Sequence, residues 1–92
     1  MYLVSYDIED NKIRNKIAKQ LENYGYRVQY SVFECRITQK RFHELYEKLA
    51  TLMEEEIGGN IRFYHICENC SKKIVTMGIA TQRDDDSDVI II

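Results

Sequence analysis

The fold is decided by residues 24–37, YGYRVQYSVFECRI. Apolar and polar residues alternate over the first part of this stretch, which is the period of a β-strand. At Phe33 the phase reverses, so that the residues which continue the apolar series change from even to odd positions. A reversal inside a continuous strand pattern indicates a tight turn or a bulge. We therefore predict two short adjacent strands, over about residues 26–30 and 32–37.

Helical patterns lie on both sides of these strands. On the N-terminal side, Asp10 is a suitable N-cap for a helix over about residues 11–24, and Gly25 suits the C′ position that stops it. On the C-terminal side, Thr38 caps a second amphipathic helix, which ends at Gly58–Gly59. The central strand pair is thus expected to connect two helices.

Further strand patterns occur near the start of the chain and after the second helix, at residues 2–7 and 60–66. A weaker strand is expected over residues 73–77, after a turn-like segment at 67–71. The order is β-α-β-β-α-β, which predicts an α+β fold of the ferredoxin-like type, with two helices on one face of an antiparallel sheet. This fold hosts many unrelated functions and does not by itself define one.

Residues 79–92 differ in character from the rest of the chain. Asp84–Asp88 is an acidic tether, and Val89–Ile92 is a run of β-branched residues that predicts a last strand. Left unpaired, such a run would be an aggregation hazard. We expect a ferredoxin-like domain over residues 1–78 and a C-terminal strand that pairs either with the sheet of its own chain or with a second subunit.

Composition limits the class of protein. The 92 residues suit one domain, and 45% hydrophobic with 30% charged residues argues against disorder. No long apolar run is present, so we expect a soluble protein without an export signal or a membrane span. Three cysteines cannot all pair within the chain, which favours a reducing cytoplasm. Residues 11–48 carry nine basic and four acidic residues, which permits contact with a polyanion, while a pI near 5.7 does not demand it.

Asp7 is the first candidate for chemistry because it ends the first strand, where a side chain leaves the core. Glu9 and Asp10 follow closely, so this loop is dense in the hard oxygen ligands that suit Mg²⁺ or Mn²⁺. The structural alternative is the more frequent one: Asp10 caps the helix and Asp7 is an ordinary residue at a strand end. Both alternatives stay open at this point.

Basic and aromatic residues suggest where a nucleic acid could bind. Arg14, Lys16 and Arg27 are candidates for phosphate contact, the arginines above all because a guanidinium can grip two oxygens. Five aromatic side chains could stack on bases, although the alternation places most of them toward the core, where they are structural: Tyr6, Tyr24, Tyr26, Tyr30 and Phe33.

The Cys67-x-x-Cys70 motif invites a metal or redox interpretation. A structural zinc needs four ligands, and only Cys35, on a distant strand, could join the pair. A redox pair would be expected at a helix N-terminus beside a βαβ crossover, which this segment is not. We therefore expect loop cysteines here, and a surface position for His43.

Several of these stretches resemble the CRISPR-associated protein 2 family. The resemblance rests on Tyr6-Asp7-Ile8, on Arg14 in the next helix, and on residues 24–34, of which Gln-x-Ser-Val-Phe-Glu is the most specific part. It continues through Ile61-Arg62-Phe63-Tyr64 and the Cys67–Cys70 segment, with Gly78 behind it.

The resemblance implies a ferredoxin-like homodimer of prokaryotic adaptive immunity that works with the CRISPR-associated protein 1 integrase in spacer acquisition. It also implies a Mg²⁺-dependent (or Mn²⁺-dependent) endonuclease that cleaves single-stranded RNA, double-stranded DNA or both. Two other functions stay open. The dimer could be a non-catalytic DNA-binding scaffold that bridges integrase subunits, or the chain could be a toxin-type endoribonuclease that acts on messenger RNA.

Carried over residue by residue, the family's metal-binding aspartate falls on Asp7. Four further residues match positions linked to activity: Tyr6, Arg14, Arg27 and Phe33. Lys16 replaces an arginine at a basic position, which removes the bidentate grip there. In the expected twofold dimer the two Asp7 carboxylates face one another and share a divalent cation, which offsets their repulsion.

Overall fold

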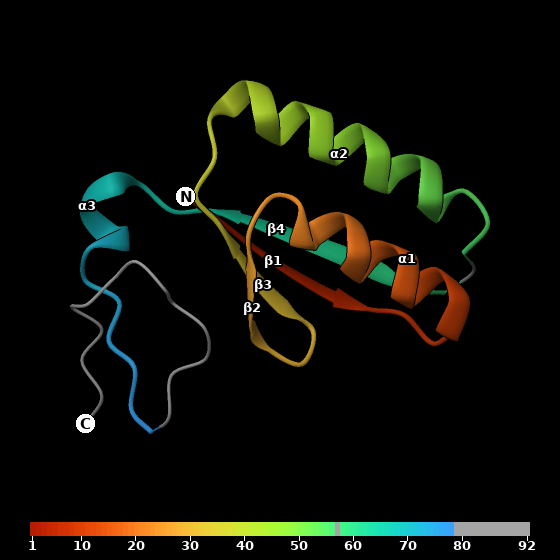
Figure 1. The fold of residues 1–92 in the computed structure, drawn as a ribbon, viewed down its shortest axis with the longest axis horizontal. Helices are drawn as coiled ribbons and strands as arrows, with labels where there is room; N and C mark the ends of the chain where they lie inside the picture. The colour runs from red at the N-terminus through yellow and green to blue at the C-terminus, as the bar shows by residue number, and fades with distance from the viewer. Residues whose placement is uncertain (57, 79–92) are drawn as a thin grey trace.

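The computed structural model describes residues 1–56 and 58–78. Its elements are β1 (Tyr2–Asp7), α1 (Asn11–Glu22), β2 (Tyr26–Gln29), β3 (Val32–Cys35), α2 (Gln39–Met53), β4 (Asn60–His65) and the short α3 (Glu68–Ser71), drawn in Figure 1. The predicted β-α-β-β-α-β order is confirmed. Within the described ranges, no helix combines the length and the apolar character that a membrane span requires.

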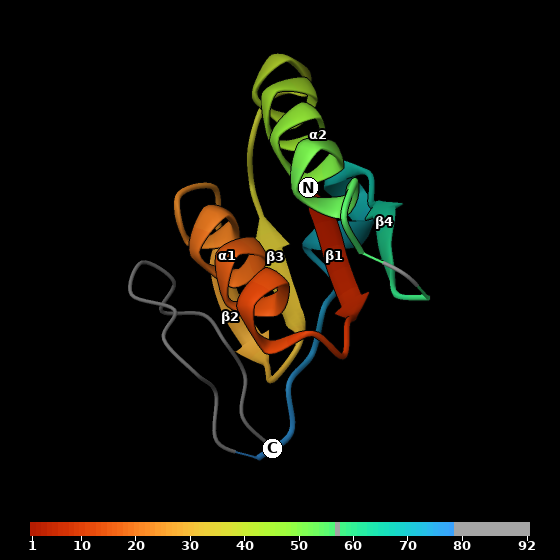
Figure 2. The same cartoon turned by 90° about the vertical axis from the view of Figure 1, so that its right-hand side faces the viewer.

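The four strands form one antiparallel sheet in the order β2-β3-β1-β4, which confirms the ferredoxin-like prediction. Val4 in the central strand β1 lies opposite Phe33 of β3 and Phe63 of β4. Helix α1 lies over the β2–β3 side of the sheet and α2 over the β1–β4 side (Figures 1 and 2). The other face of the sheet carries neither of these helices.

The core lies between the sheet and the two long helices. Even-numbered residues of β1 are buried against the helices, whereas its odd-numbered residues face the other way, as the period of two requires. The helices contribute residues at helical spacing to the same core. The side chains that are completely buried, at less than 2% exposure, are Phe33, Ile17, Leu21, Leu45, Leu49, Val4 and Cys35.

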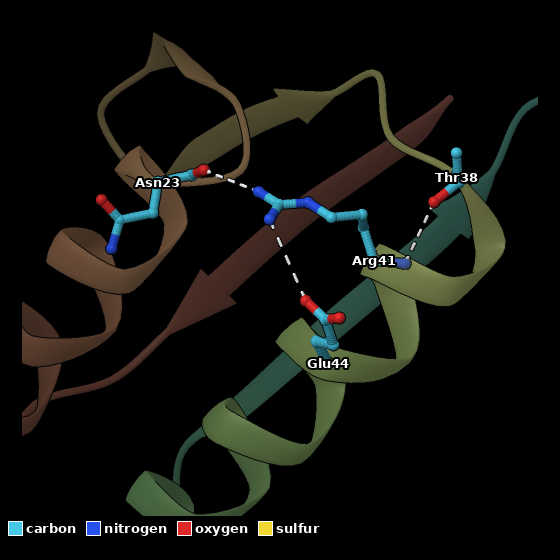
Figure 3. Close-up of polar contacts among 4 residues, drawn as sticks. All are labelled: Asn23, Thr38, Arg41 and Glu44. Atoms are coloured by element: carbon cyan, nitrogen blue, oxygen red, sulfur yellow. Dashed lines mark hydrogen bonds and ion pairs between the residues drawn. The ribbon is translucent and has the colours of Figure 1, made fainter.

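Arg41, at the start of α2, connects the two helices (Figure 3). Its guanidinium lies over the Tyr24 ring, 4.4 Å from the centroid, and donates a 3.2 Å hydrogen bond to the carbonyl of Asn23. Its backbone N–H donates to the hydroxyl of Thr38, which confirms the predicted N-cap. A longer ion pair of 3.9 Å joins Arg41 to Glu44.

The predicted pair of central strands is confirmed, and a bulge accompanies it. Arg27 pairs with Phe33, but the next paired residue of β2 is Gln29, opposite Val32. Tyr30 lies in the turn that follows β2 and is 77% exposed. The expectation that the alternation turns Tyr30 toward the core is wrong, because this residue lies beyond the end of the paired strand.

Helix α1 ends earlier than predicted, at Glu22, with Asn23 as its C-cap. Gly25 has no positive φ, so it does not act as the left-handed stop that the sequence suggested. Its role is steric instead: a Cβ at this position would collide with the backbone carbonyl of Glu34 in β3. Gly25 thus allows the chain to return closely along the sheet.

The segment after β4 also differs from the prediction. The expected turn at residues 67–71 contains helix α3, and the expected strand over residues 73–77 is wrong, since only Thr76 forms an isolated β-bridge there. The predicted acidic tether and last strand, within residues 79–92, lie outside the described residues.

Candidate nucleic-acid and metal site

Two consecutive residues at the end of β1 point to opposite faces of the sheet. Tyr6 is buried on the helix side, where its ring lies 6.3 Å from that of Phe33. Asp7 is exposed on the face without long helices, and its Cα is paired with that of Asn60 in β4. The structure therefore places Asp7 apart from the other predicted site residues, on the opposite side of the strand.

Arg14 holds the loop that follows Asp7. Its guanidinium donates hydrogen bonds to the carbonyls of Ile8 (2.9 Å) and Glu9 (3.3 Å), and to the side-chain oxygen of Asn11. Asp10 caps α1 by accepting a 3.0 Å hydrogen bond from the backbone N–H of Ile13, as the structural alternative expected. Arg14 is thus a positioning residue for the loop that carries Asp7.

A small polar pocket of about 70 Å³ lies on the helix side of the sheet. It brings together three of the predicted site residues, Tyr6, Arg14 and Arg27, with Tyr30, one of the five aromatic residues named from the sequence, and with Asn15, which the sequence did not indicate. The turn that carries Tyr30 is fixed to β1, because the backbone N–H of Tyr6 donates a 3.1 Å hydrogen bond to the carbonyl of Ser31.

Phe33 contacts one of the residues that line this pocket, Arg27. Its side chain is fully buried, and the guanidinium of Arg27 lies 5.2 Å from the centre of its ring. Such a cation–π contact orients the guanidinium. Phe33 therefore contacts Arg27 from within the core. Lys16, exposed on α1, does not line the pocket.

The metal expectation can be tested on the residues around Asp7. Among the described residues, no three His, Cys, Asp or Glu side chains gather in a way that could hold a metal ion. Glu56, which the sequence did not indicate, lies nearby: its Oε2 and the Asp7 carbonyl are both within 3 Å of where a Cβ on Gly59 would sit. Mg²⁺ commonly binds through one or two carboxylates, completed by water and substrate phosphate. An exposed Asp7 fits that type of open site.

The larger groove of the described structure has a different character. It measures about 300 Å³, lies between α2 and β4, and is lined by Tyr46, Leu49, Ala50, Met53, Glu54, Ile61 and Phe63. Because its only charged residue is acidic, it is unsuited to a polyanion. Charge thus favours the smaller pocket as a phosphate site.

These features define a small ferredoxin-like protein with an arginine-lined pocket on one face of the sheet and an exposed carboxylate on the other. Residues 1–74 match the family model described as CRISPR associated protein Cas2. A curated relative, CRISPR-associated endoribonuclease Cas2 1 of Chloroflexus aurantiacus, is 41% identical over 91 residues, which cover 99% of this chain and 98% of the relative.

Solved structures agree with this match. Streptococcus pyogenes Cas2 is 34% identical, with a TM-score of 0.71 over 84% of this chain and 98% of that one. A chain of a partial Cas6-RT-Cas1–Cas2 complex is 38% identical, with a TM-score of 0.65 over 77% of this chain and 82% of that one. The chain belongs to the CRISPR associated protein Cas2 family.

Proposed function

We propose that this chain is a metal-dependent endonuclease of CRISPR spacer acquisition that hydrolyses phosphodiester bonds of single-stranded RNA, double-stranded DNA or both. The observation that carries the proposal is the exposed Asp7 at the end of β1, directly before a loop that Arg14 holds in place. Further support comes from relatives that are named endoribonucleases and from a similar chain in a complex with Cas1.

The pocket residues would bind and orient the nucleic acid. The guanidinium of Arg27, supported by Phe33, can grip two phosphate oxygens. The exposed ring of Tyr30 can stack on an unpaired base, which favours a single strand at this position. Arg14 contributes positive charge and fixes the loop after Asp7. Lys16 on α1 adds a solvated positive charge that can attract the phosphate backbone of the nucleic acid.

Asp7 would hold the cation, Mg²⁺ or Mn²⁺. When bound, such a cation supplies Lewis acidity to a phosphodiester and its attacking water. The carboxylate of Asp7 is suited to this role because it is a hard oxygen ligand that faces solvent.

A homodimer would bring two copies of Asp7 together. The face of the sheet without long helices carries Leu3 and Asp7, at odd positions of β1. It also carries Tyr64 of β4, which is paired with Leu3. Tyr64 is 46% exposed on this face. Covering this face with a second copy would remove apolar area from water. It would also bring the two faces that carry Asp7 against one another.

The test is nuclease activity of Asp7→Asn, measured on single-stranded RNA and on double-stranded DNA, with Mg²⁺ and with chelator. We expect loss of the Mg²⁺-dependent cleavage. Asp10→Asn is the matched control, since it removes a carboxylate from the same loop while asparagine retains the N-cap. Unchanged cleavage by Asp7→Asn would show that Asp7 is not the metal-binding residue.

A non-catalytic scaffold that bridges integrase subunits is the second candidate. It is favoured by the similarity to a chain of the Cas1–Cas2 complex. Spacer acquisition in cells that carry Asp7→Asn separates the two functions, because a scaffold retains acquisition and a required nuclease does not. The toxin-type alternative has no supporting observation of its own.

A further inference from the structure

Two exposed cysteines occupy a single helical turn beyond the sheet, away from the proposed nuclease site. Cys67 is the N-cap of α3, and the backbone N–H of Cys70 donates a 3.4 Å hydrogen bond to the Cys67 sulfur. The sequence predicted loop cysteines away from a helix N-terminus, and this prediction is wrong because Cys67 caps α3. The structure instead places the two thiols side by side.

The two thiols are chemically unequal. Hydrogen bonds from the backbone N–H and from the thiol of Cys70 lower the pKa of Cys67. The same thiol contact, followed by the charge of Cys67, raises the pKa of Cys70. One sulfur is therefore favoured as a thiolate and the other as its proton donor, which is the division of roles between an attacking and a resolving thiol.

The third cysteine provides an internal contrast. Cys35 is completely buried in β3, and burial, followed by the charge of Glu34, raises the pKa of its thiol to about 11. Such a thiol is neither accessible nor ionised near neutral pH. Any reversible thiol chemistry of the described chain is thus confined to Cys67 and Cys70.

The geometry permits a bond between the two sulfurs. Residues three apart on a helical turn have Cβ atoms about 5–6 Å apart, and a disulfide needs roughly 3.5–4.5 Å. A small local adjustment closes that difference, and both side chains are free of packing because they face solvent. A metal fits less well, because no third ligand joins the pair among the described residues and the ring of His65 is stacked on Tyr2 at 4.7 Å.

We propose that Cys67 and Cys70 form a reversible dithiol–disulfide modification site that reacts with small disulfides such as oxidised glutathione, with Cys67 as the attacking sulfur. This site is independent of the proposed nuclease function, since neither cysteine contacts the pocket or Asp7.

The exchange proceeds in two steps. The Cys67 thiolate attacks one sulfur of oxidised glutathione, so that a mixed disulfide forms, the glutathione S–S bond breaks and one glutathione thiolate leaves. Cys70 then loses its proton to solvent and attacks the Cys67 sulfur, which releases the second glutathione thiolate. The protein dithiol is oxidised by two electrons, and one glutathione disulfide is reduced to two glutathione molecules.

The test uses the full chain in glutathione redox buffers with a chelator present, followed by acid quench, alkylation of the remaining thiols and mass spectrometry with peptide mapping. We expect the wild type to form an intrachain disulfide between Cys67 and Cys70 while Cys35 stays reduced. Treatment with excess reduced glutathione should restore three alkylatable thiols. Persistence of three free thiols under oxidising buffer, or a disulfide between chains in place of the internal one, would overturn the proposal.

Single variants test the assigned roles. Cys70→Ser should stop at a mixed disulfide with glutathione on Cys67, because the resolving sulfur is absent. Cys67→Ser should react more slowly at Cys70, because a backbone N–H hydrogen bond lowers the pKa of Cys67 and none does so for Cys70. Equal rates in the two variants would contradict the assignment of Cys67 as the attacking sulfur. Both residues are exposed, so neither change should affect folding.

Discussion

At the scale of single residues, Tyr6 and Asp7 illustrate how a strand period of two separates two tasks. Tyr6 turns toward the helices and lines the polar pocket, whereas Asp7 turns to the opposite face and stays exposed. The loop between Asp7 and α1 is held by Arg14, whose guanidinium spans the carbonyls of Ile8 and Glu9. A sequence pattern can predict that a residue lies at a strand end, but it cannot predict which side chain fixes the loop beyond it.

Arg14→Lys tests this positioning role. An ammonium group cannot reproduce the planar set of donors that reaches Ile8, Glu9 and Asn11. We expect a loss of about 1–2 kcal/mol in the free energy of unfolding, measured by urea denaturation. Lys16→Gln, an exposed change on the same helix, should stay within about 0.5 kcal/mol of wild type. Equal stability of the two variants would mean that Arg14 does not hold the loop.

Because the thiol of Cys35 is buried, we expect the free energy of unfolding to fall at alkaline pH. Its pKa is raised from 9.0 to about 11 in the folded chain, chiefly by burial, so the unfolded thiol ionises first as the pH rises. The stabilising effect is complete below pH 9 and is lost between pH 9 and about 11. At pH 10.5 this amounts to a loss of about 2 kcal/mol relative to neutral pH.

The measurement compares urea denaturation of wild type and Cys35→Ala at pH 7.5 and pH 10.5. Alanine lowers stability at both values by leaving a small cavity, but it has no proton to lose. The stability advantage of the wild type over Cys35→Ala, measured as the difference in their free energies of unfolding, should therefore be smaller at pH 10.5 than at pH 7.5. A constant gap would show that the buried thiol does not contribute to the pH dependence.

At the scale of elements, the sequence predicted the positions of most helices and strands, but less of how these elements pair and pack. The phase reversal at Phe33 and the caps Asp10 and Thr38 placed two strands and two helix starts correctly, because these signals are local. Tyr30 was misplaced because β2 ends at Gln29 and Tyr30 lies in the turn, a boundary that depends on pairing with β3. The strand expected over residues 73–77 was also misplaced: Thr76 forms only a bridge, and Val75 and Met77 beside it are exposed.

The contact between α1 and α2 gives a prediction at this scale. Arg41→Ala removes the guanidinium from the Tyr24 ring and from the Asn23 carbonyl, and we expect a loss of about 1–2 kcal/mol in unfolding free energy. Glu44→Ala should change stability by less than about 0.5 kcal/mol, because its ion pair with Arg41 is exposed and 3.9 Å long. Chemical denaturation of both variants measures this, and a larger effect of Glu44→Ala would indicate that the ion pair, and not the ring contact, joins the helices.

At the scale of the whole molecule, the two faces of the sheet have different surroundings. One face packs on α1 and α2, and the other carries Leu3, Asp7 and Tyr64. The family match accounts for the sequence resemblance over residues 1–74, while the assembly that covers the second face remains a proposal.

Two tyrosines of nearly equal exposure test that assembly. Tyr64 is 46% exposed on the sheet face proposed to pair, and Tyr46 is 47% exposed on α2. Tyr64→Arg should convert a dimer to a monomer in analytical ultracentrifugation, because it places a charge inside the proposed interface. Tyr46→Arg should leave the dimer intact. Dissociation caused by Tyr46→Arg alone would place the interface on the helix side.

The account depends most on two Asp7 carboxylates, one from each subunit, that hold a single divalent cation. Titration with Mn²⁺, followed by electron paramagnetic resonance of the free ion, measures this directly. We predict one bound ion for every two chains in the wild type and in Asp10→Asn, and loss of that ion in Asp7→Asn. One ion for each chain, or undiminished binding by Asp7→Asn, would contradict the shared site.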